Sequence, residues 1–417
     1  MNTNLSAAFA TTLLLLCCIG STQAQQQIID SVAVERINST LESFVESGAI
    51  KGVSAMVFEK DKEVYFKAFG MADEEAGLSM SRDTIVQIFS MTKPVTGVAL
   101  MTLHEQGKFR LDDPVSKYIP SFANLKVATG KDDDGNLILV EPKRPMTIRD
   151  LTRHTSGLAG NHGPAWVKDL IKDDPLKPEN TLEQAVEKFS KIPLWFHPGE
   201  QWSYGPSVDI QARLVEILSR KKFDQYIQET ILDPLKMKDT SYRVPPEKLG
   251  RMAGIYWRDD NTGELSRKSG EKDFNTKPWP MTPGGWGLTA TINDYMRFAR
   301  MLQNEGELDG VRVLKAETVK LMATSHLSDD VKKRSWLPSK GQVGFGIDFA
   351  VRVSPPNSDD EPNGVAGEFF WDGAASTMFW VDPKNDLTAV MFVQLRPFDK
   401  IGLQKAFRNA VYGPRKQ

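Results

Sequence analysis

The amino-acid sequence predicts an α/β protein in which a mostly helical domain is inserted into a domain assembled from the two ends of the chain. Runs rich in β-branched and aromatic residues occur at 53–73 and again at 343–395, and they indicate strands. Between them, proline-broken segments carry apolar residues at helical spacing. We therefore expect an α/β domain of residues 28–110 and 285–417, a helical domain of residues 111–284, and a binding cleft between the two.

Composition excludes some classes of function. The chain has 417 residues, of which 40% are hydrophobic, enough for two domains with a full core. Its formal net charge is -2, so it has no excess of basic residues with which to neutralise a phosphate backbone. Nucleic acid is therefore not an expected partner.

The N-terminus has the pattern of an export signal. The apolar run AAFATTLLLLCCIG is too short to span a bilayer comfortably, and small residues at Thr22 and Ala24 follow it. We expect residues 1–24 to be a signal peptide and the mature protein to be exported, periplasmic or secreted, without a membrane segment. Because no Lys or Arg precedes the run, a buried or anchoring helix is the alternative. Cys17 and Cys18 both lie inside this segment, so disulfides, a cysteine nucleophile and zinc–thiolate sites are not expected.

The remaining elements are expected in a simple order. A helix over 32–47 precedes a hairpin whose strands meet at a polar turn near 60–62. A second hairpin, turning on Asp134–Gly135, interrupts the helical middle, and a last helix covers 400–413. The helical segments of the middle are 147–158, 181–192 and 207–220.

Ser90 is expected to begin a helix that ends at Gly107, with Lys93 one turn further along on the same face. Pro94 fits the first turn because its missing amide hydrogen is not needed there. The helix N-terminus offers amide hydrogens to an anion formed in acyl transfer, and a partly buried lysine could act as a base or activate one. The alternative is a serine that caps the helix beside a surface lysine.

The same Ser-x-x-Lys spacing occurs at Ser219–Lys222 and Ser269–Lys272, both among many charged residues. Spacing alone therefore does not predict a site. Tyr204 adds a third group, because it lies in a turn before an amphipathic helix and a tyrosine beside a cationic lysine can accept a serine proton. Alternatively, Tyr204 is a packing aromatic.

Seven segments along nearly the whole mature chain resemble the penicillin-recognising serine hydrolases, a family that comprises class C β-lactamases, D-alanyl-D-alanine peptidases and family VIII carboxylesterases. The segments are FSMTKPVTGVAL, LDDPVSKYIP, MTIRDLTRHTSGL, HPGEQWSYGPSVDI, ILDPLKMKDTSY, GGWGLTATINDYMRFARML and GEFFWDGAASTMFWVDPKNDL. The resemblance implies a β-lactamase/transpeptidase-like fold, with an antiparallel sheet flanked by helices. It also implies Ser90 as the acylated nucleophile, Lys93 as its partner and Tyr204 as the tyrosine of the second motif.

The third motif of the family falls on WDG, Trp371 to Gly373, which is expected on an edge strand that lines the cleft. The resemblance implies an oxyanion hole made by the backbone amide of Ser90 and an amide from that strand, here Ala374 or its neighbour. His154, in HTSGL, is expected to be a packing histidine rather than a catalytic base.

Two positions depart from the β-lactamase and peptidase pattern. Pro206 replaces an asparagine that hydrogen-bonds the substrate amide and the lysine, and proline cannot supply those bonds. Trp371 and Asp372 replace the lysine or histidine that helps to hold a substrate carboxylate, and loss of such a contact costs about 1.5–3 kcal/mol. Asp372 should repel a carboxylate, whereas Trp371 offers apolar surface to a neutral group. Pro206, Trp371, Asp372 and Gly373 are therefore the expected substrate-binding residues, and the pattern is similar to the esterase branch, which usually has glycine in place of Asp372.

We therefore expect an exported serine hydrolase that cleaves a small-molecule ester or amide, with carboxylic esters as the first choice. With Lys93 assisting, Tyr204 would take the Ser90 proton, and water would later release the acyl group. The alternatives are a β-lactamase or D-alanyl-D-alanine carboxypeptidase, an amide or oligomer hydrolase, and a non-catalytic binding protein on the same fold. No cofactor and no metal are expected, because the five histidines lack paired spacing and no phosphate loop occurs. The chain also lacks a G-x-S-x-G elbow, which disfavours an α/β-hydrolase triad. The physiological substrate and the oligomeric state are left open.

Overall fold

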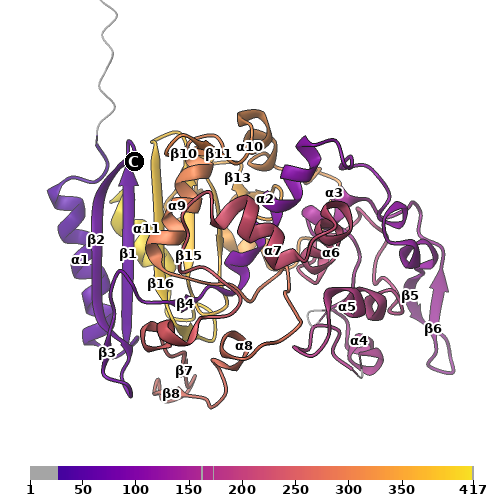
Figure 1. Ribbon diagram of the computed structural model, residues 1–417, viewed down its shortest axis with the longest axis horizontal. Helices are drawn as coiled ribbons and strands as arrows, with labels where there is room; N and C mark the ends of the chain where they lie inside the picture. Colours follow the sequence, from indigo (N-terminus) through magenta and orange to yellow (C-terminus); the bar gives the residue numbers. More distant parts are fainter. Residues whose placement is uncertain (1–26, 161–162, 172, 416–417) are drawn as a thin grey trace, which may run out of the picture.

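A computed structural model describes residues 27–160, 163–171 and 173–415, so the predicted signal peptide and both cysteines lie outside the described residues. The centre of the fold is an eight-stranded sheet (Figure 1). Its neighbouring strands are antiparallel throughout, as the resemblance implies. In sheet order the strands are β12 (Val343–Phe345), β13 (Ala350–Arg352), β14 (Phe369–Asp372), β15 (Met378–Asp382), β16 (Leu387–Val393), β1 (Gly52–Glu59), β2 (Lys62–Asp73) and β3 (Leu78–Ser79).

Strands from the two ends of the chain meet in the middle of this sheet (Figure 1). β16 pairs with β1 along its whole length, from Val393 opposite Val53 to Leu387 opposite Glu59. β1 pairs on its other side with β2, which forms the hairpin predicted to turn near 60–62. The sheet is therefore completed only when residues from both ends of the chain are present.

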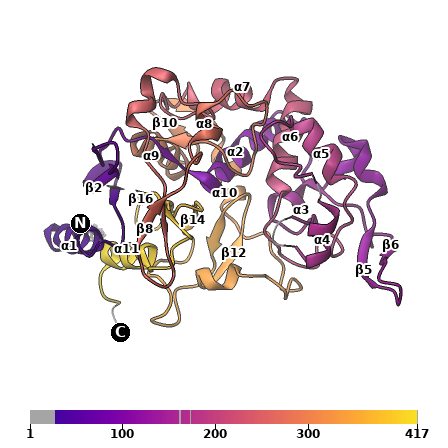
Figure 2. The same cartoon turned by 90° about the horizontal axis from the view of Figure 1, so that it is seen from below.

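Helices cover both faces of the sheet: α1 (Ser31–Glu46) and α11 (Leu403–Tyr412) lie side by side on one face, and α9 (Ile292–Gln303) lies on the other (Figures 1 and 2). Successive side chains of β15 point to opposite faces. Phe379 meets Tyr295 of α9, with ring centroids 5.2 Å apart, and Trp380 meets Phe407 of α11 at 5.4 Å. All of β15 is consequently buried.

Between residues 111 and 284 the chain forms short helices and two β-hairpins, and α6 of this part packs against α2 (Thr92–Glu105). The end of this part lies with the sheet instead, because β7 (Tyr256–Arg258) pairs with β17 (Leu395–Arg396) (Figure 1). The predicted helical segment 147–158 is helical only at its start, because His154 and Gly157 adopt positive φ angles of 57° and 81° and turn the chain. The helices are α3 (Ile148–Thr152), α4 (Ala165–Leu170), α5 (Leu182–Phe189), α6 (Ser207–Ser219), α7 (Phe223–Ile227) and α8 (Asp273–Thr276), and the predicted second hairpin consists of β5 (Val127–Lys131) and β6 (Leu137–Val140).

Short elements connect these parts. The remaining strands are β4 (Val86–Gln87), β8 (Leu265–Arg267), β9 (Thr289–Ala290), β10 (Glu307–Leu308) and β11 (Val311–Arg312), and the remaining helix is α10 (Ala316–Met322). Short 3₁₀ or π segments are η1 (Phe89–Met91), η2 (Val115–Lys117), η3 (Pro120–Asn124), η4 (Gln228–Leu232), η5 (Pro246–Arg251) and η6 (Leu337–Lys340). Of the helices within the described residues, each is too short or too polar to cross a membrane.

Candidate active site

The chain turns sharply immediately before Ser90. Phe89 has a φ of 46°, a conformation that residues other than glycine rarely adopt, and the Ile88 amide beside it donates a hydrogen bond to the Leu288 carbonyl oxygen at 3.1 Å. Ser90 lies in the 3₁₀ turn η1, so α2 begins two residues later than the sequence predicts. Ser90 is partly exposed, directly before a helix whose residues 92–103 are buried.

Lys93 lies on the first turn of α2 and is only 5% exposed. Its Nζ donates hydrogen bonds to Ser90 Oγ at 3.2 Å and to the carbonyl oxygen of Gly285 at 2.5 Å. The same nitrogen lies 4.5 Å from the centre of the Tyr204 ring, a cation–π distance. The structure therefore brings Ser90, Lys93 and Tyr204 together around one buried nitrogen.

Tyr204 lies in the loop before α6, as the sequence predicts, and is partly buried. The indole Nε1 of Trp371 donates a hydrogen bond to its hydroxyl at 3.4 Å. The rings of Trp371, Trp336 and His154 have centroids 5.5, 5.4 and 4.8 Å from that of Tyr204. The phenol thus lies between the lysine of α2 and the third motif on β14.

The expectation that the third motif lies on an edge strand is wrong. β14 is the third strand of the sheet and pairs with both β13 and β15. β13 is only three residues long and pairs with Phe369 and Phe370. Trp371 and Asp372 consequently extend beyond the register of β13, and this places the motif beside the site although its strand is internal.

Gly373 brings the end of β14 against the segment that precedes Ser90. A methyl group on Gly373 would lie 2.4 Å from the carbonyl oxygen of Ile88 and 2.3 Å from Thr377 Oγ1, both too close for a real side chain. Only glycine allows this approach. The half-buried Ala374 follows in the turn, and its part in an oxyanion hole stays a prediction.

Asp372 is neutralised by Lys340 of η6, which sequence reasoning missed. The two side chains form an ion pair and are 11% and 9% exposed, respectively. Lys340 Nζ also lies 5.1 to 5.2 Å from the ring centres of Trp336, Trp371 and Phe398. Asp372 is therefore not the repelling charge that the sequence predicted, because the cation of Lys340 already compensates it. No sequence motif links the two residues, and only the fold reveals the pair.

A cavity of about 180 Å³ opens beside Lys93 and Tyr204. Pro206, at the N-cap of α6, forms part of its wall, where an asparagine would have presented an amide. Trp286 is a further member that the sequence did not single out. The apolar members of the wall are Ile171, Pro175, Leu176, Phe189, Pro206 and Trp286. The cavity therefore presents mainly carbon beside the amine and the phenol.

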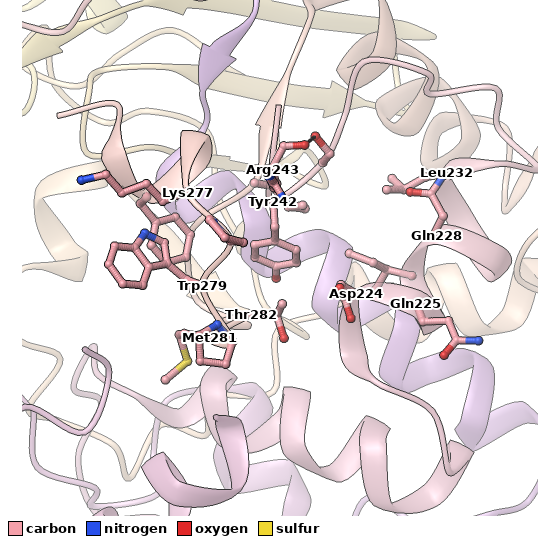
Figure 3. Close-up of a pocket in the computed structure, with 16 residues that line it drawn as sticks. Asp224, Gln225, Gln228, Leu232, Tyr242, Arg243, Lys277, Trp279, Met281 and Thr282 are labelled. Atoms are coloured by element: carbon pink, nitrogen blue, oxygen red, sulfur yellow. Dashed lines mark hydrogen bonds between the residues drawn. The ribbon is translucent and has the colours of Figure 1, made fainter. Parts of the chain in front are cut away.

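A larger cavity of about 570 Å³ lies along the neighbouring segment 277–282 (Figure 3). Figure 3 shows Tyr242, Trp279 and Met281 in its wall, and the Tyr242 hydroxyl donates a hydrogen bond to the Pro283 carbonyl oxygen at 2.6 Å. The site residues predicted from the sequence do not line it. The smaller cavity is the candidate active site because Lys93 and Tyr204 line it and Ser90 Oγ lies 3.2 Å from Lys93 Nζ.

Two buried carboxylates lie near Lys93 and were not found from the sequence. Burial raises the pKa of Asp209 to about 6, although the charge of Lys93 and the amide of Gly285 act in the opposite direction. Burial also raises the pKa of Asp348 well above its usual range, and Gln211 donates a hydrogen bond to this carboxyl at 2.9 Å. The glycine-rich segment GGWGL, which contains Gly285, was visible in the sequence. Only the fold shows that Gly285 contacts Lys93 and Asp209.

His154 lies in the core, as predicted for a packing residue. It is fully buried, and its pKa is held well below the usual value by burial and by the charge of Lys93. Within the described residues, neither ring nitrogen has a hydrogen-bond partner. Of the two other Ser-x-x-Lys pairs, Lys272 donates to Asp73 and to a backbone carbonyl, and Lys222 is exposed. In the part of the chain that the structure describes, no cluster of three or more His, Cys, Asp or Glu could hold a metal ion.

The fold and this constellation define a serine hydrolase of the β-lactamase/transpeptidase-like class. A family model described as Beta-lactamase matches residues 37–412, and the chain belongs to this family. Within the family it is an esterase- and acyltransferase-like serine hydrolase, and this confirms the family resemblance noted in the sequence.

Three similar proteins illustrate this relationship. Protein Rv1367c of Mycobacterium tuberculosis is 34% identical over 370 residues, which cover 86% of this chain and 89% of the relative. Lovastatin esterase of Penicillium rubens is 28% identical over 405 residues, which cover 90% and 98%. The solved structure of unliganded simvastatin synthase (LovD) from Aspergillus terreus, in its selenomethionyl form, has a TM-score of 0.78 at 23% identity, covers 92% of this chain and 98% of its own, and confirms the predicted fold.

Proposed function

We propose that this protein is an exported hydrolase that cleaves carboxylic esters through an acyl-enzyme on Ser90. The observation that carries the proposal is the buried Lys93 Nζ, which donates to Ser90 Oγ at 3.2 Å and lies against the face of the Tyr204 ring. Similarity to lovastatin esterase along nearly the whole chain supports an ester as the substrate. The N-terminal apolar run followed by small residues supports export.

The proposed reaction has two acyl-transfer steps. Tyr204, whose phenolate would be stabilised by Lys93, takes the proton of Ser90 while Oγ attacks the ester carbonyl. The backbone amides of Ser90 and Ala374 hold the resulting oxyanion. The carbon–oxygen bond to the alcohol then breaks, and the alcohol leaves with the proton from Tyr204. Water adds to the acyl-enzyme by the same route and releases the acid.

Neutral esters with an apolar acyl or alkyl group suit the cavity best. Trp371 and Trp336 lie against Tyr204, and Pro206 and Trp286 line the cavity beside Lys93. These side chains offer carbon surface to a substrate. Lys340, which contacts the third motif, is already paired with Asp372 and largely buried, so its charge is not free to bind a substrate carboxylate.

A fluorophosphonate probe tests the proposal, followed by a panel of p-nitrophenyl esters from acetate to octanoate. We expect intact-mass measurement to find one adduct on the wild-type protein and on Ser219→Ala, a matched control with the same Ser-x-x-Lys spacing, and none on Ser90→Ala. Ester hydrolysis should be lost only with Ser90→Ala. Equal labelling of Ser90→Ala would refute the nucleophile, and a wild-type protein without adduct or hydrolysis would favour a binding protein.

The second candidate is a β-lactamase or D-alanyl-D-alanine carboxypeptidase, which shares the Ser90, Lys93 and Tyr204 arrangement. Pro206 argues against it, because the missing side-chain amide cannot bind the amide of a penicillin or peptide. We expect nitrocefin and a D-alanyl-D-alanine peptide to be turned over more slowly than p-nitrophenyl acetate. Faster turnover of either would replace the ester proposal, and an amide or oligomer hydrolase would show itself by turnover of simple anilides.

A further inference from the structure

We propose that Asp209 is a positioning residue for Lys93. Asp209 acts through the backbone of Gly285 and replaces the function of the asparagine that the second motif lacks. The inference rests on the proposed function, since it assigns a task to Lys93 in that reaction. Asp209 lies on α6, five positions after Tyr204, and the family resemblance assigns it no role.

A continuous chain of contacts links the carboxylate to the lysine. Asp209 Oδ1 accepts a hydrogen bond from the Gly285 amide at 3.0 Å, and the Gly285 carbonyl oxygen accepts one from Lys93 Nζ at 2.5 Å. Both backbone groups of this one residue are therefore used, one toward α6 and the other toward α2. Displacing Gly285 would displace the acceptor that holds Lys93 beside Ser90.

The space around Gly285 is as restricted as its hydrogen bonds. A methyl group on Gly285 would lie 3.2 Å from a carboxylate oxygen of Asp209 and 3.3 Å from Lys93 Nζ, so the carboxylate and the amine both adjoin this one backbone position. The preceding Gly284 lies against α6, where a methyl group would be 2.3 Å from the Val208 carbonyl oxygen. Its own carbonyl oxygen accepts a hydrogen bond from Thr96 of α2 at 2.7 Å. The glycine pair thus forms a narrow bridge between the two helices.

Charge gives Asp209 a second effect on Lys93. The carboxylate is fully buried, which raises its pKa to about 6, so it is ionised in neutral and alkaline solution. Lys93 of α2 and the Gly285 amide face it with positive charge, whereas the phenol of Tyr242 faces it from the segment after α7. Lys93 is also within electrostatic reach of Asp348 and His154, which follow β12 and α3 in the chain. An ionised Asp209 therefore attracts the Lys93 side chain, in addition to holding it through Gly285.

Proline explains why another residue must hold the lysine. Pro206 occupies the place of the asparagine that contacts the lysine in β-lactamases and peptidases, and it has no side-chain donor or acceptor. Asp209 stands one helical turn further along the same segment. The structure therefore places an acceptor close to the missing one and connects it to Lys93 through the backbone of Gly285.

The pH profile of Ser90 labelling and of ester hydrolysis tests the inference. Asp209→Asn keeps an oxygen for the Gly285 amide but loses the negative charge beside Lys93, so the pH profile of kcat/KM should move to lower pH by about one unit. Asp209→Leu removes the acceptor as well. The rate of labelling by a fluorophosphonate and the kcat of ester hydrolysis should each fall about a hundredfold, and KM should change little.

Asp294→Asn is the matched control, because Asp294 is also buried, accepts a backbone amide and has a pKa raised to about 6, yet lies on α9 away from the cavity. Its pH profile and labelling rate should equal those of the wild type. The inference is overturned if Asp209→Asn and wild type have superimposable profiles, and this isosteric variant remains informative if Asp209→Leu does not fold. A wild-type protein that is neither labelled nor active would instead refute the proposed function itself.

Discussion

Trp336 and Tyr204 meet edge to face, with their ring centroids 5.4 Å apart, and Trp336 leaves 38% of its surface exposed. The indole of Trp336 also packs edge to face against Trp202, with ring centroids 5.4 Å apart. An exposed aromatic ring held beside the phenol of a candidate active site is a ready contact for a substrate. Trp336 therefore forms an apolar wall next to the proposed proton acceptor.

Replacement of this wall should affect large substrates more than small ones. We expect Trp336→Ala to raise KM about tenfold for p-nitrophenyl esters with branched or aromatic acyl groups, because burial of such a group against an indole stabilises binding by about 1.5 kcal/mol. The KM for the acetate ester should change little. Leu249→Ala, at a similarly exposed apolar residue on η5, is the control. An equal change for the acetate ester would show that Trp336 supports the site rather than the substrate.

The pair of Lys340 and Asp372 should matter more to stability than a surface ion pair. Both side chains are about nine-tenths buried, and removal of one partner leaves an uncompensated buried charge, at a cost of about 3 kcal/mol. We expect Lys340→Met to lower the free energy of unfolding in urea by that amount. Adding Asp372→Asn should restore most of the lost free energy of unfolding. A double variant no more stable than the single one would show that the lysine stabilises the protein through the rings of Trp336, Trp371 and Phe398 rather than through its charge.

Lys93 and Tyr204 should contribute to turnover rather than to folding. We expect Lys93→Ala and Tyr204→Phe each to lower kcat for ester hydrolysis by about 10²- to 10⁴-fold, the range of a lost general base. Both variants should stay folded, as measured by circular dichroism, and Lys93→Ala should melt somewhat lower than Tyr204→Phe because it leaves the buried Asp209 without its cation. If both variants melted far below the wild type while keeping their kcat, the cluster would be a packing arrangement.

Asp294 should make stability depend on pH. Its pKa is raised from 3.8 to about 6 by burial, so the folded state binds the proton more tightly than the unfolded one, and stability from this group is lost as pH rises through 6. Asp294→Asn should therefore unfold with a free energy about 3 kcal/mol higher than the wild type at pH 8. The difference should shrink toward pH 4, and a constant difference across this range would contradict the assignment.

Sequence reasoning reached the parts of the site that local pattern encodes. The turn and helix around Ser90 and Lys93, and the loop that carries Tyr204, follow from spacing and turn chemistry that neighbouring residues determine. The structure brings these three residues together, although it starts α2 two residues late because Phe89 adopts a positive φ. Their catalytic roles stay predictions.

Long-range contacts account for what the sequence did not reveal. Lys340 is 32 positions from its partner Asp372, and Gly285 is 192 positions from Lys93. No periodicity or propensity connects residues so far apart, because such contacts depend on how the strands and helices pack. The internal position of β14 was missed for the same reason, since strand order is a property of the whole sheet.

Because β1 pairs with β16, the central sheet cannot form until β16 has been synthesised. β1 cannot pair with β16 until residues 387–393 have been synthesised, so the backbone groups of β1 lack this partner while the intervening residues 60–386 are translated. Contacts that span so much of the chain fold slowly, and an unpaired strand is a template for aggregation. A nonsense mutation just before residue 387 would thus remove an internal strand of the sheet and leave β1 without this partner.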